Sequence, residues 1–254
     1  MTIADRSFPK AFYDDPDFNY QDYWSGRSYE HQAEVIAIRR LLNRQLFAHA
    51  VDIGGGYGRL AVVLAEFAAR VTLVDSSSQQ LALAEAFLAS HPRITGRQME
   101  AANLDFPDES VDLVTMVRLL HHLPEPTAEL AEVRRILRPG GYAIIEVANI
   151  AHALNRLRYL VKRKPVPSVA LDIRSEETRQ RGGIAFVNHH PQSITELVES
   201  IGLRVECVLS VSNLRHRLVK KALPDRMILA AERVLQPKLA RIQFGPSLFF
   251  LLRR

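Results

Sequence analysis

The 254-residue sequence predicts an α/β fold in which helices cover both faces of a parallel sheet, a doubly wound arrangement. Two observations lead to this prediction. Short apolar segments alternate with segments of helical periodicity up to about residue 150, and a glycine-rich turn follows the first apolar segment. Hydrophobic residues make up 47% of the chain and charged residues 24%, which is ordinary for a globular protein with a stable core.

The first part of the chain supplies a helix, a strand and a second helix. Residues 29–48 are expected to form an amphipathic helix, because apolar side chains recur at helical spacing at Val35, Ile38, Leu42 and Leu46. A buried strand then ends in the glycine turn. The helix after this turn is expected to aim its free N–H groups at the turn and to bury one face, formed by Leu60, Val63, Leu64 and Phe67.

The alternation of strands and helices continues beyond the turn. Further strands are expected over residues 71–74, 94–99, 111–117 and 142–147. Helices are expected between them, one with Leu81, Ala84 and Leu88, the other with Leu130, Val133 and Leu137. The second helix should stop at the Arg-Pro-Gly-Gly sequence of residues 138–141, because proline cannot continue a helix and glycine supplies the turn.

After residue 150 the pattern becomes looser. Residues 152–164 predict a basic amphipathic helix, and residues 165–190 a loop or cap. A capping box of Ser193 with Glu196 is expected to open a helix that Gly202 closes. The remaining elements are expected in this order: a strand over 203–211, two short helices within 213–236 broken at Pro224, and a last strand over 247–252.

Charge is distributed unevenly along the chain. Residues 1–150 carry 14 Lys/Arg and 20 Asp/Glu, a balance of −6, whereas residues 151–254 carry 19 and 8, a balance of +11. The basic part favours an anionic substrate, a lipid surface or nucleic acid, or it is a solvated surface that aids solubility. The single cysteine, Cys207, excludes an internal disulfide, and the polar start of the chain and the lack of a long apolar run predict a cytoplasmic protein.

The glycine turn follows the pattern D-x-G-x-G-x-G at Asp52, Gly54, Gly56 and Gly58. Glycine lets the backbone turn sharply through positive φ and lets a ligand touch the main chain, which indicates a nucleotide-type cofactor. Residues 56–61 also fit the dinucleotide pattern G-x-G-x-x-A, so an NAD-dependent dehydrogenase is the alternative. The acid at the strand end disfavours a pyrophosphate and suits a ligand that carries an amino group and a sulfonium.

Four blocks in order carry a resemblance to a known family: VDIGGGYGRLA (51–61), VTLVDSSSQQL (71–81), MEAANLDFPDESVDLVTMVRLLHHLPEP (99–126) and EVRRILRPGGYAIIEVAN (132–149). Over roughly residues 45–150 the chain resembles the class I S-adenosylmethionine-dependent methyltransferases, in particular the small-molecule subgroup that includes quinone-biosynthesis C-methyltransferases. The resemblance implies a Rossmann-like seven-stranded sheet with an antiparallel last strand, helical cap insertions and S-adenosylmethionine as cofactor.

The resemblance also implies roles for single residues in cofactor binding. The glycine turn, Gly55 included, would hold the cofactor beside Asp52. Asp75, followed by Ser76, would accept hydrogen bonds from both ribose hydroxyls. Glu100 stands where the family usually has Asp, which keeps a bond to the adenine amino group feasible but changes its reach, and the N–H of Ala101 would meet the ring. Val117, at the end of a strand, would line the methionine end of the cofactor.

An aromatic cluster near the N-terminus suggests a lid, since Tyr20, Tyr23, Trp24 and Tyr29 surround Arg27. In one interpretation Arg27 pairs with the cofactor carboxylate and the aromatic rings stabilise the sulfonium by cation–π contact. In the other, a helix packs these aromatic side chains on the edge of the sheet.

Methyl transfer from a sulfonium needs alignment and desolvation, and needs a general base only if the acceptor must lose a proton. His122 is the candidate catalytic base, with His121 a weaker one, although this pair also fits a purely structural turn. Two interpretations stay open for His189 and His190: they line an acceptor pocket, or they are exposed to solvent at the start of a helix. No recurring ligand spacing indicates a metal site.

The chain is expected to comprise an N-terminal helical lid (1–48), a cofactor-binding core (49–150), a basic cap insertion (151–190) and the C-terminal part of the methyltransferase fold with a helical insertion (191–254). The expected acceptor is a small molecule, amphiphilic or anionic, with peripheral membrane contact through the basic amphipathic segments as one hypothesis. RNA methylation is an alternative that no visible RNA-binding module supports, and a non-catalytic cofactor-binding module is a third.

Overall fold

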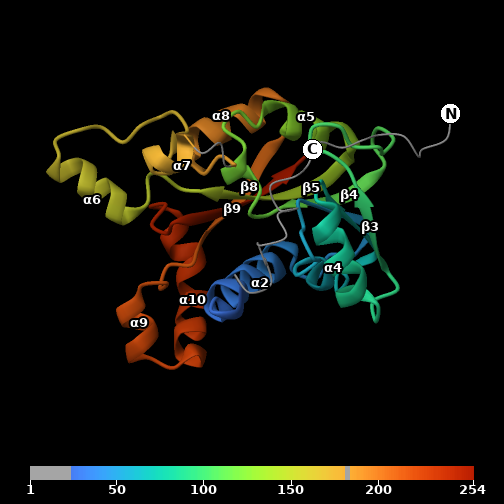
Figure 1. The fold of residues 1–254 in the computed structure, drawn as a ribbon, viewed down its shortest axis with the longest axis horizontal. Helices are drawn as coiled ribbons and strands as arrows, with labels where there is room; N and C mark the ends of the chain where they lie inside the picture. Colours follow the sequence, from blue (N-terminus) through green and yellow to red (C-terminus); the bar gives the residue numbers. More distant parts are fainter. Residues whose placement is uncertain (1–23, 181–183) are drawn as a thin grey trace.

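The computed structural model describes residues 24–180 and 184–254, so the predictions for Tyr20 and Tyr23 lie outside the described residues. A seven-stranded sheet crosses the molecule in the order β3-β2-β1-β4-β5-β9-β8 (Figure 1). Its strands are β1 (Phe47–Ile53), β2 (Ala68–Asp75), β3 (Ile94–Gln98), β4 (Val111–Met116), β5 (Leu137–Ala148), β8 (Arg204–Val211) and β9 (Ser247–Arg253).

The direction of the strands confirms the predicted sheet. Strands β1 to β5 pair in parallel, and β9 runs antiparallel to both β5 and β8. All residues of β4 and six of the seven residues of β1 are buried. Such nearly continuous apolar strands are typical of a parallel sheet covered on both faces. The chain therefore has the α/β, doubly wound, Rossmann-like fold with an antiparallel last strand.

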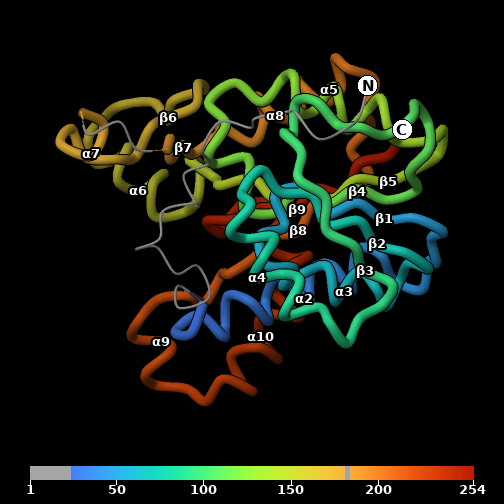
Figure 2. Tube along the Cα trace, turned by 45° about the vertical axis from the view of Figure 1, so that its right-hand side comes forward, coloured from blue at the N-terminus to red at the C-terminus, as the bar shows by residue number. Residues whose placement is uncertain are grey.

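Helices cover the two faces of the sheet and form one core layer with each. One layer contains side chains of α2 (Ser28–Leu42), α3 (Ala61–Leu64), α4 (Ser78–Leu88) and α10 (Asp225–Ala240). The other contains side chains of α5 (Thr127–Ile136) and α8 (Pro191–Ser200). Figure 2 shows these two groups on opposite sides of the sheet.

The first two helices are shorter than the sequence predicts. Helix α2 ends at Leu42, since Asn43 adopts a left-handed backbone conformation (φ 52°), and Leu46 is consequently 81% exposed. Helix α3 is a single turn rather than the longer helix expected after the glycines. The chain from Gly58 must reach β2 quickly, because the carbonyl of Phe67 already accepts a hydrogen bond from the N–H of Phe47 (2.8 Å). The prediction of a long helix here is wrong.

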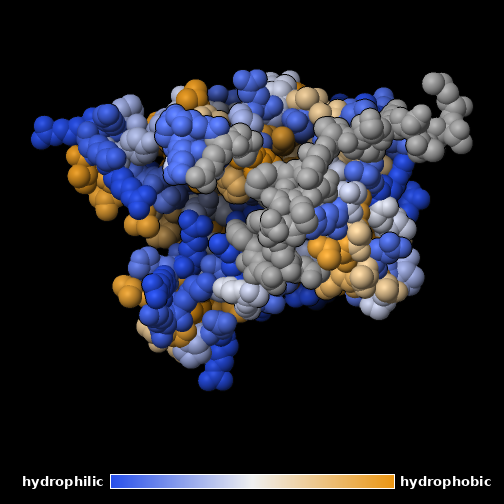
Figure 3. Space-filling view, viewed as in Figure 1, coloured by the Kyte–Doolittle hydropathy of each residue, from blue (hydrophilic) through white to orange (hydrophobic). Residues whose placement is uncertain are grey.

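The segment between β5 and α8 has more structure than the expected loop. It contains α6 (Ala153–Val161), α7 (Glu176–Gln180) and a two-stranded sheet of β6 (Leu171–Asp172) and β7 (Val187–Asn188). Helix α6 lies at the left of Figure 1, away from the sheet, and apolar side chains are visible along it in Figure 3.

The predicted capping box at Ser193 is wrong. Helix α8 begins at Pro191, and Nδ1 of His190 accepts the capping hydrogen bond from the N–H of Gln192 (3.3 Å). Proline suits the first helical position because its missing N–H would have no partner there. The hydroxyl of Ser193 instead donates to the carbonyl of Ser168 (2.6 Å), which ties the preceding segment to this helix.

The C-terminal helices match the prediction of a break at Pro224. They are α9 (Arg217–Ala222) and α10, which is longer than expected and contacts α2 and β8. A short 3-10 helix, η3 (Leu120–His122), follows β4. None of the helices within 24–180 and 184–254 is both long and apolar enough to cross a bilayer.

Candidate functional site

The glycine turn connects β1 to α3 through a backbone that only glycine tolerates. Gly54, Gly56 and Gly58 have φ values of 67°, 57° and 91°, in the left-handed region. At Gly55 a Cβ atom would lie 2.2 Å from Cδ1 of Leu73, so no side chain fits there. These constraints explain why glycine is needed at these positions, of which Gly54 and Gly55 are half-buried and Gly56 and Gly58 are buried.

Asp75 fixes the position of this turn. It ends β2, and its Oδ2 accepts a hydrogen bond from the N–H of Gly56 (2.8 Å) while Oδ1 accepts from the N–H of Ser77 (2.9 Å). A carboxylate offers about four acceptor positions, so an acid that organises the turn can also accept from hydroxyl groups of a ligand. Ser76, predicted at the same site, lies next to it, half-buried, with its carbonyl bonded to the side chain of Gln98 (2.8 Å).

Glu100 and Ala101 lie at the same edge of the sheet as Asp75. The N–H of Met99 donates to the carbonyl of Asp75 (3.1 Å), which brings the end of β3 beside the end of β2. Glu100 and Ala101 follow directly and are half-buried. The structure thus brings the predicted ribose and adenine residues together, next to the glycine turn. We call the ends of β1 to β4 with these residues the cofactor edge.

Asp52 is fully buried below the turn. Its Oδ1 accepts a hydrogen bond from the hydroxyl of Thr115 (2.5 Å), whereas Oδ2 has no hydrogen-bond partner among the described residues. Burial raises the pKa of this carboxyl to about 6, although the hydrogen bond from Thr115 opposes the shift. A buried, half-satisfied acid beside the glycine turn fits a cofactor that carries positive charge, such as S-adenosylmethionine.

Val117 and Arg118 continue from β4 at the same edge. Val117 is buried and belongs to the hydrophobic core, and its place at the methionine end of the cofactor stays a prediction. Arg118 has a φ of 62°, unusual for a non-glycine residue, and its N–H donates to Oε2 of Glu146 (3.3 Å). Burial raises the pKa of Glu146, an effect that Arg118 opposes. The backbone at Arg118 is thereby held in a conformation that turns its side chain toward α2.

Sequence analysis missed an ion-pair network that ties α2 to the cofactor edge. Glu34 is fully buried, and its two oxygens accept from the guanidinium groups of Arg59 (2.7 Å) and Arg118 (2.6 Å). Burial alone would raise the pKa of Glu34, but the two arginines outweigh burial and lower it. A signal existed in the sequence, since Glu34 lies four residues before the core residue Ile38 and therefore on the buried side of the helix.

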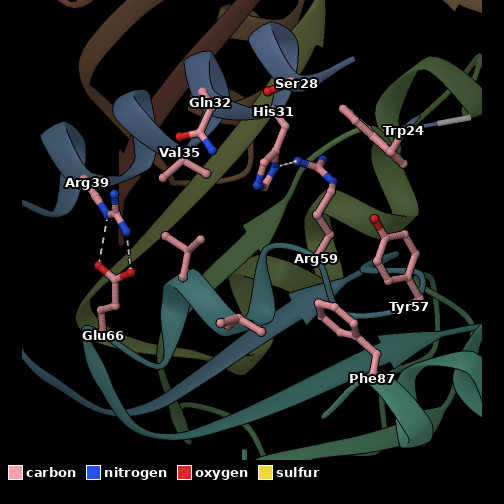
Figure 4. A pocket seen from close by; sticks show the side chains of 12 residues that line it. Trp24, Ser28, His31, Gln32, Val35, Arg39, Tyr57, Arg59, Glu66 and Phe87 are labelled. Atoms are coloured by element: carbon pink, nitrogen blue, oxygen red, sulfur yellow. Dashed lines mark hydrogen bonds and ion pairs between the residues drawn. The ribbon is translucent and has the colours of Figure 1, made fainter. Parts of the chain in front are cut away.

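Trp24 covers the outer side of the glycine turn. The guanidinium of Arg59 lies 3.6 Å from the centre of the Trp24 ring, a close cation–π contact. Arg59 also bonds to Nδ1 of His31 (2.6 Å), as Figure 4 shows. These groups, with Tyr57 and Phe87, line a cavity of about 490 Å³ between α2, α3 and α4. Trp24 thus stacks on an arginine of the protein itself.

The other residues of the predicted lid divide between two roles. Tyr29 is buried and structural, because its hydroxyl donates to Glu232 (2.8 Å) and accepts from the N–H of Leu214 (2.9 Å). For Tyr29 the packing interpretation is therefore the correct one. Arg27 precedes α2 and is half-buried, near Arg215. Its role toward the cofactor carboxylate stays a prediction.

The histidines after β4 are packed against the segment before α8. Nδ1 of His122 lies 2.9 Å from the carbonyl of Ala185, and the His122 ring contacts Phe186 edge-on at 4.6 Å. Burial lowers the pKa of His122. Burial and repulsion from His122 and Arg118 lower the pKa of His121 well below its ordinary value. Both rings are consequently neutral at pH 7, and catalysis by His122 would have to use Nε2.

His189 and His190 have structural contacts. Nε2 of His189 bonds to the carbonyl of Leu120 (3.0 Å), and its backbone bridges to Ala148 and Ile150, while His190 caps α8. Across the described part of the chain, no group of three or more His, Cys, Asp or Glu side chains is arranged to hold a metal ion.

A second group of residues lies at the same edge of the sheet, beyond β4. Ala148 of β5 and Val211 of β8 are both paired with Ser247, so the segments that follow these two strands emerge side by side. We call these segments, residues 149–152 and 212–216, the acceptor side. They contain His152 and Arg215, and His152 has a pKa lowered to about 4 by burial and by the neighbouring Arg215.

Arg215 is a cation whose surroundings favour an anion. Its side chain reaches solvent, but the surrounding protein limits its hydration. This desolvation, together with repulsion from Arg118 and Arg27, lowers the pKa of Arg215, whereas the charge of Glu30 raises it. Among the described residues, Arg215 forms no hydrogen bond or ion pair through its guanidinium. The start of the loop that carries it is attached to α10, because Glu232 accepts a hydrogen bond from the N–H of Asn213 (3.1 Å).

Comparison with known proteins matches the part of the chain that contains the cofactor edge. Residues 51–145 match the model of the methyltransferase domain family. The chain is 28% identical over 163 residues to the ubiquinone/menaquinone biosynthesis C-methyltransferase UbiE of Rubrivivax gelatinosus, covering 64% of this chain and 59% of that protein. It is 27% identical over 196 residues to a probable S-adenosylmethionine-dependent methyltransferase of Mycolicibacterium smegmatis, covering 77% and 65%. The chain thus spans less than two thirds of the length of these relatives.

Solved structures share the fold over almost the whole chain. A SAM-dependent methyltransferase of Thermotoga maritima, described as a possible histamine N-methyltransferase, has a TM-score of 0.63 at 19% identity and covers 95% of this chain and 98% of its own. An S-adenosylmethionine-dependent methyltransferase of Mesorhizobium loti has a TM-score of 0.59 at 22% identity, with coverages of 87% and 98%. The matched domain, the relatives and the fold support the assignment of this chain to the class I S-adenosylmethionine-dependent methyltransferases resembling quinone C-methyltransferases, and imply S-adenosylmethionine as its cofactor.

Proposed function

We propose that this protein transfers a methyl group from S-adenosylmethionine to a small-molecule acceptor in the cytoplasm. The observation that carries the proposal is the bond between Asp75 and the N–H of Gly56, because it fixes the acid that would bind the ribose beside the glycine turn at one edge of the sheet. Ligands of open α/β sheets bind at the carboxyl ends of the strands. The relative from Rubrivivax gelatinosus acts, by its name, in quinone biosynthesis, which supports a small molecule as acceptor.

The residues of the cofactor edge would divide the work of binding. When bound, S-adenosylmethionine supplies an electrophilic methyl group on a sulfonium sulfur. Asp75 would accept from the ribose hydroxyls, and Glu100 would accept from the adenine amino group. Asp52 would place a negative charge below the turn, where it stabilises the positive charge of the cofactor. Val117 would exclude water from the methionine end, and Arg27 would pair with its carboxylate.

We propose further that the acceptor is anionic or amphiphilic. The support is the position of Arg215 on the acceptor side, at the same edge of the sheet as the end of β4 and close enough to Arg118 to interact with it electrostatically. An acceptor acid or enolate oxygen would give this guanidinium a direct anionic partner, in addition to the more distant charges of Glu30 and Glu146. If the acceptor must lose a proton, Nε2 of His122 would take it. The lowered pKa of this ring keeps it unprotonated at pH 7, and burial makes it a weak base.

Calorimetry with S-adenosylmethionine, S-adenosylhomocysteine and NADH in parallel tests the cofactor. Both sulfur compounds should bind and NADH should not, and Asp75→Asn should weaken binding at least about tenfold, since a charged hydrogen bond contributes about 1.5–3 kcal/mol. Arg27→Ala should also lower the affinity for S-adenosylmethionine. The matched controls are Asp225→Asn and Arg44→Ala, which change exposed residues away from the cofactor edge. Folded protein that binds neither S-adenosylmethionine nor S-adenosylhomocysteine would refute the proposal.

Radiolabelled methyl transfer into a fractionated cell extract then separates the alternatives. Label in the small-molecule fraction supports the proposed acceptor. Label in RNA, which the +11 balance of residues 151–254 could attract, would indicate an RNA methyltransferase. Cofactor binding without any label in the extract would indicate a non-catalytic module.

A further inference from the structure

Helix α6 and the residues just after it contribute no side chain to the core. The helix contains no buried residue and is carried away from the sheet, at the left of Figure 1. Asn155 and the half-buried Tyr159 form its inner side, and Asn155 attaches it to the body through a bond to the carbonyl of Ile150 (3.0 Å). A nine-residue helix is marginal in water unless something covers its apolar face.

The outer side of α6 is apolar and faces solvent. Its four large apolar side chains recur at helical spacing and share a stripe about 120° wide at about 100° per residue. Their exposed fractions are far above those of core residues: Leu154 56%, Leu157 57%, Leu160 72% and Val161 75%. Figure 3 shows apolar atoms gathered along this helix.

Basic side chains flank this stripe on both sides. Residues 151–164 contain no acid, and their five Lys/Arg residues are Arg156, Arg158, Lys162, Arg163 and Lys164. At 100° per residue, Arg158 falls on one side of the leucine stripe and Arg156 on the other, and Lys162, Arg163 and Lys164 follow at the C-terminal end of the helix. An apolar stripe between two rows of cations is the arrangement of helices that lie in the interface of a bilayer with anionic lipids.

A second exposed helix points to the same side of the molecule. Helix α9 exposes Leu218 (68%), and apolar atoms gather around it in Figure 3, below those of α6. Figure 2 also shows α6 and α9 at the same side. Their first residues lie close together, because His152 directly precedes α6, Arg215 lies two residues before α9, and the charge of Arg215 lowers the pKa of His152. Both helices therefore emerge from the acceptor side.

Charge decides which partner fits this surface. A second copy of the chain packed α6 against α6 would bring two sets of five cations together without acids to compensate, which is unfavourable. A bilayer with anionic headgroups supplies both the apolar interior for the leucines and the negative charge for the flanking cations. We propose that the exposed faces of α6 and α9 dock this protein on an anionic membrane surface, with the acceptor side next to the lipid.

Co-sedimentation with vesicles tests this docking. Wild-type protein should sediment with vesicles of equal parts phosphatidylglycerol and phosphatidylcholine, and not with phosphatidylcholine alone. Leu160→Glu should weaken this binding at least tenfold. Its matched control is Leu46→Glu, which changes an equally exposed leucine (81%) just before β1, at the opposite edge of the sheet, and should bind as wild type does. Lys162→Glu should also weaken binding, whereas Arg44→Glu should not.

The outcomes are decisive in both directions. Absence of wild-type binding to anionic vesicles at low salt, or equal binding by Leu160→Glu and Leu46→Glu, would overturn the docking. A dimer in sedimentation velocity that Leu160→Glu dissociates would assign the surface to a second copy instead. Calorimetry with S-adenosylhomocysteine on the same variants keeps this test separate from the proposed function, because cofactor binding should be unchanged in all four.

Discussion

The cofactor edge and the acceptor side lie next to each other but use charge in opposite ways. At the cofactor edge the acids Asp52 and Asp75 are held by hydrogen bonds from Thr115, Gly56 and the backbone after β2. On the acceptor side Arg215 is a cation that reaches solvent and has no ion pair among the described residues. A site for a ligand that related proteins share can be built into the core. A site for a ligand that differs between related proteins is more often carried by exposed segments.

The largest effect should come from the buried network that joins α2 to the cofactor edge. Glu34→Ala removes the buried carboxylate that pairs with both Arg59 and Arg118 and should lower the free energy of unfolding by about 3–5 kcal/mol. Glu66→Ala removes an exposed partner of Arg39 and should cost about 0–1 kcal/mol. Urea unfolding of both variants makes the comparison, and equal losses would mean that burial does not strengthen the Glu34 network.

The next effect is a pH dependence set by Asp52. Its pKa is about 6 in the folded protein and near 3.8 in the unfolded chain, so the folded state holds the extra proton between these values. The contribution of this group to stability therefore decreases as pH rises from about 4 to about 6 and is constant above that. Affinity for S-adenosylmethionine should change in the opposite sense, rising from pH 5 to pH 7 as the carboxylate becomes charged.

Asp52→Asn isolates this group from the other acids. The amide keeps a bond to Thr115, so the variant should be at least as stable as wild type at pH 7 by thermal unfolding. It should bind S-adenosylmethionine more weakly, and calorimetry should no longer show a rise in affinity around pH 6. Unchanged affinity and an unchanged pH profile would show that Asp52 serves only the fold.

The smallest effect is expected on the acceptor side. Arg215→Ala should raise the KM for an anionic acceptor about tenfold, the equivalent of one exposed charged hydrogen bond, with little change in kcat or in the KM for S-adenosylmethionine. Arg217→Ala, two residues away and exposed, is the control and should leave all three constants unchanged. An equal effect of both variants would mean that general positive charge, rather than a fixed contact, attracts the acceptor.

The local pattern of the sequence predicts most of the cofactor edge. The strand ends, the glycine turn and the acids Asp75 and Glu100 follow from hydrophobic alternation and from the ordered blocks, because parallel strands bring their carboxyl ends to one edge. The break at Pro224 and the end of α5 before residues 138–141 were predicted for the same reason: glycine and proline act on the backbone locally. The lengths of α2 and α3 were not predicted, because they depend on contacts between β1 and β2, which are far apart in the sequence.

What the sequence alone determined about this protein is the order of its strands and helices, its glycine turn and the acids beside it, since these depend on neighbours along the chain. Only the tertiary structure decided that Glu34 joins Arg59 to Arg118, that Tyr29 belongs to the core and that Arg215 comes close to His152. These contacts join residues up to 203 positions apart in the sequence. Local spacing along the chain does not determine which charged side chains come into contact when the helices pack on the sheet.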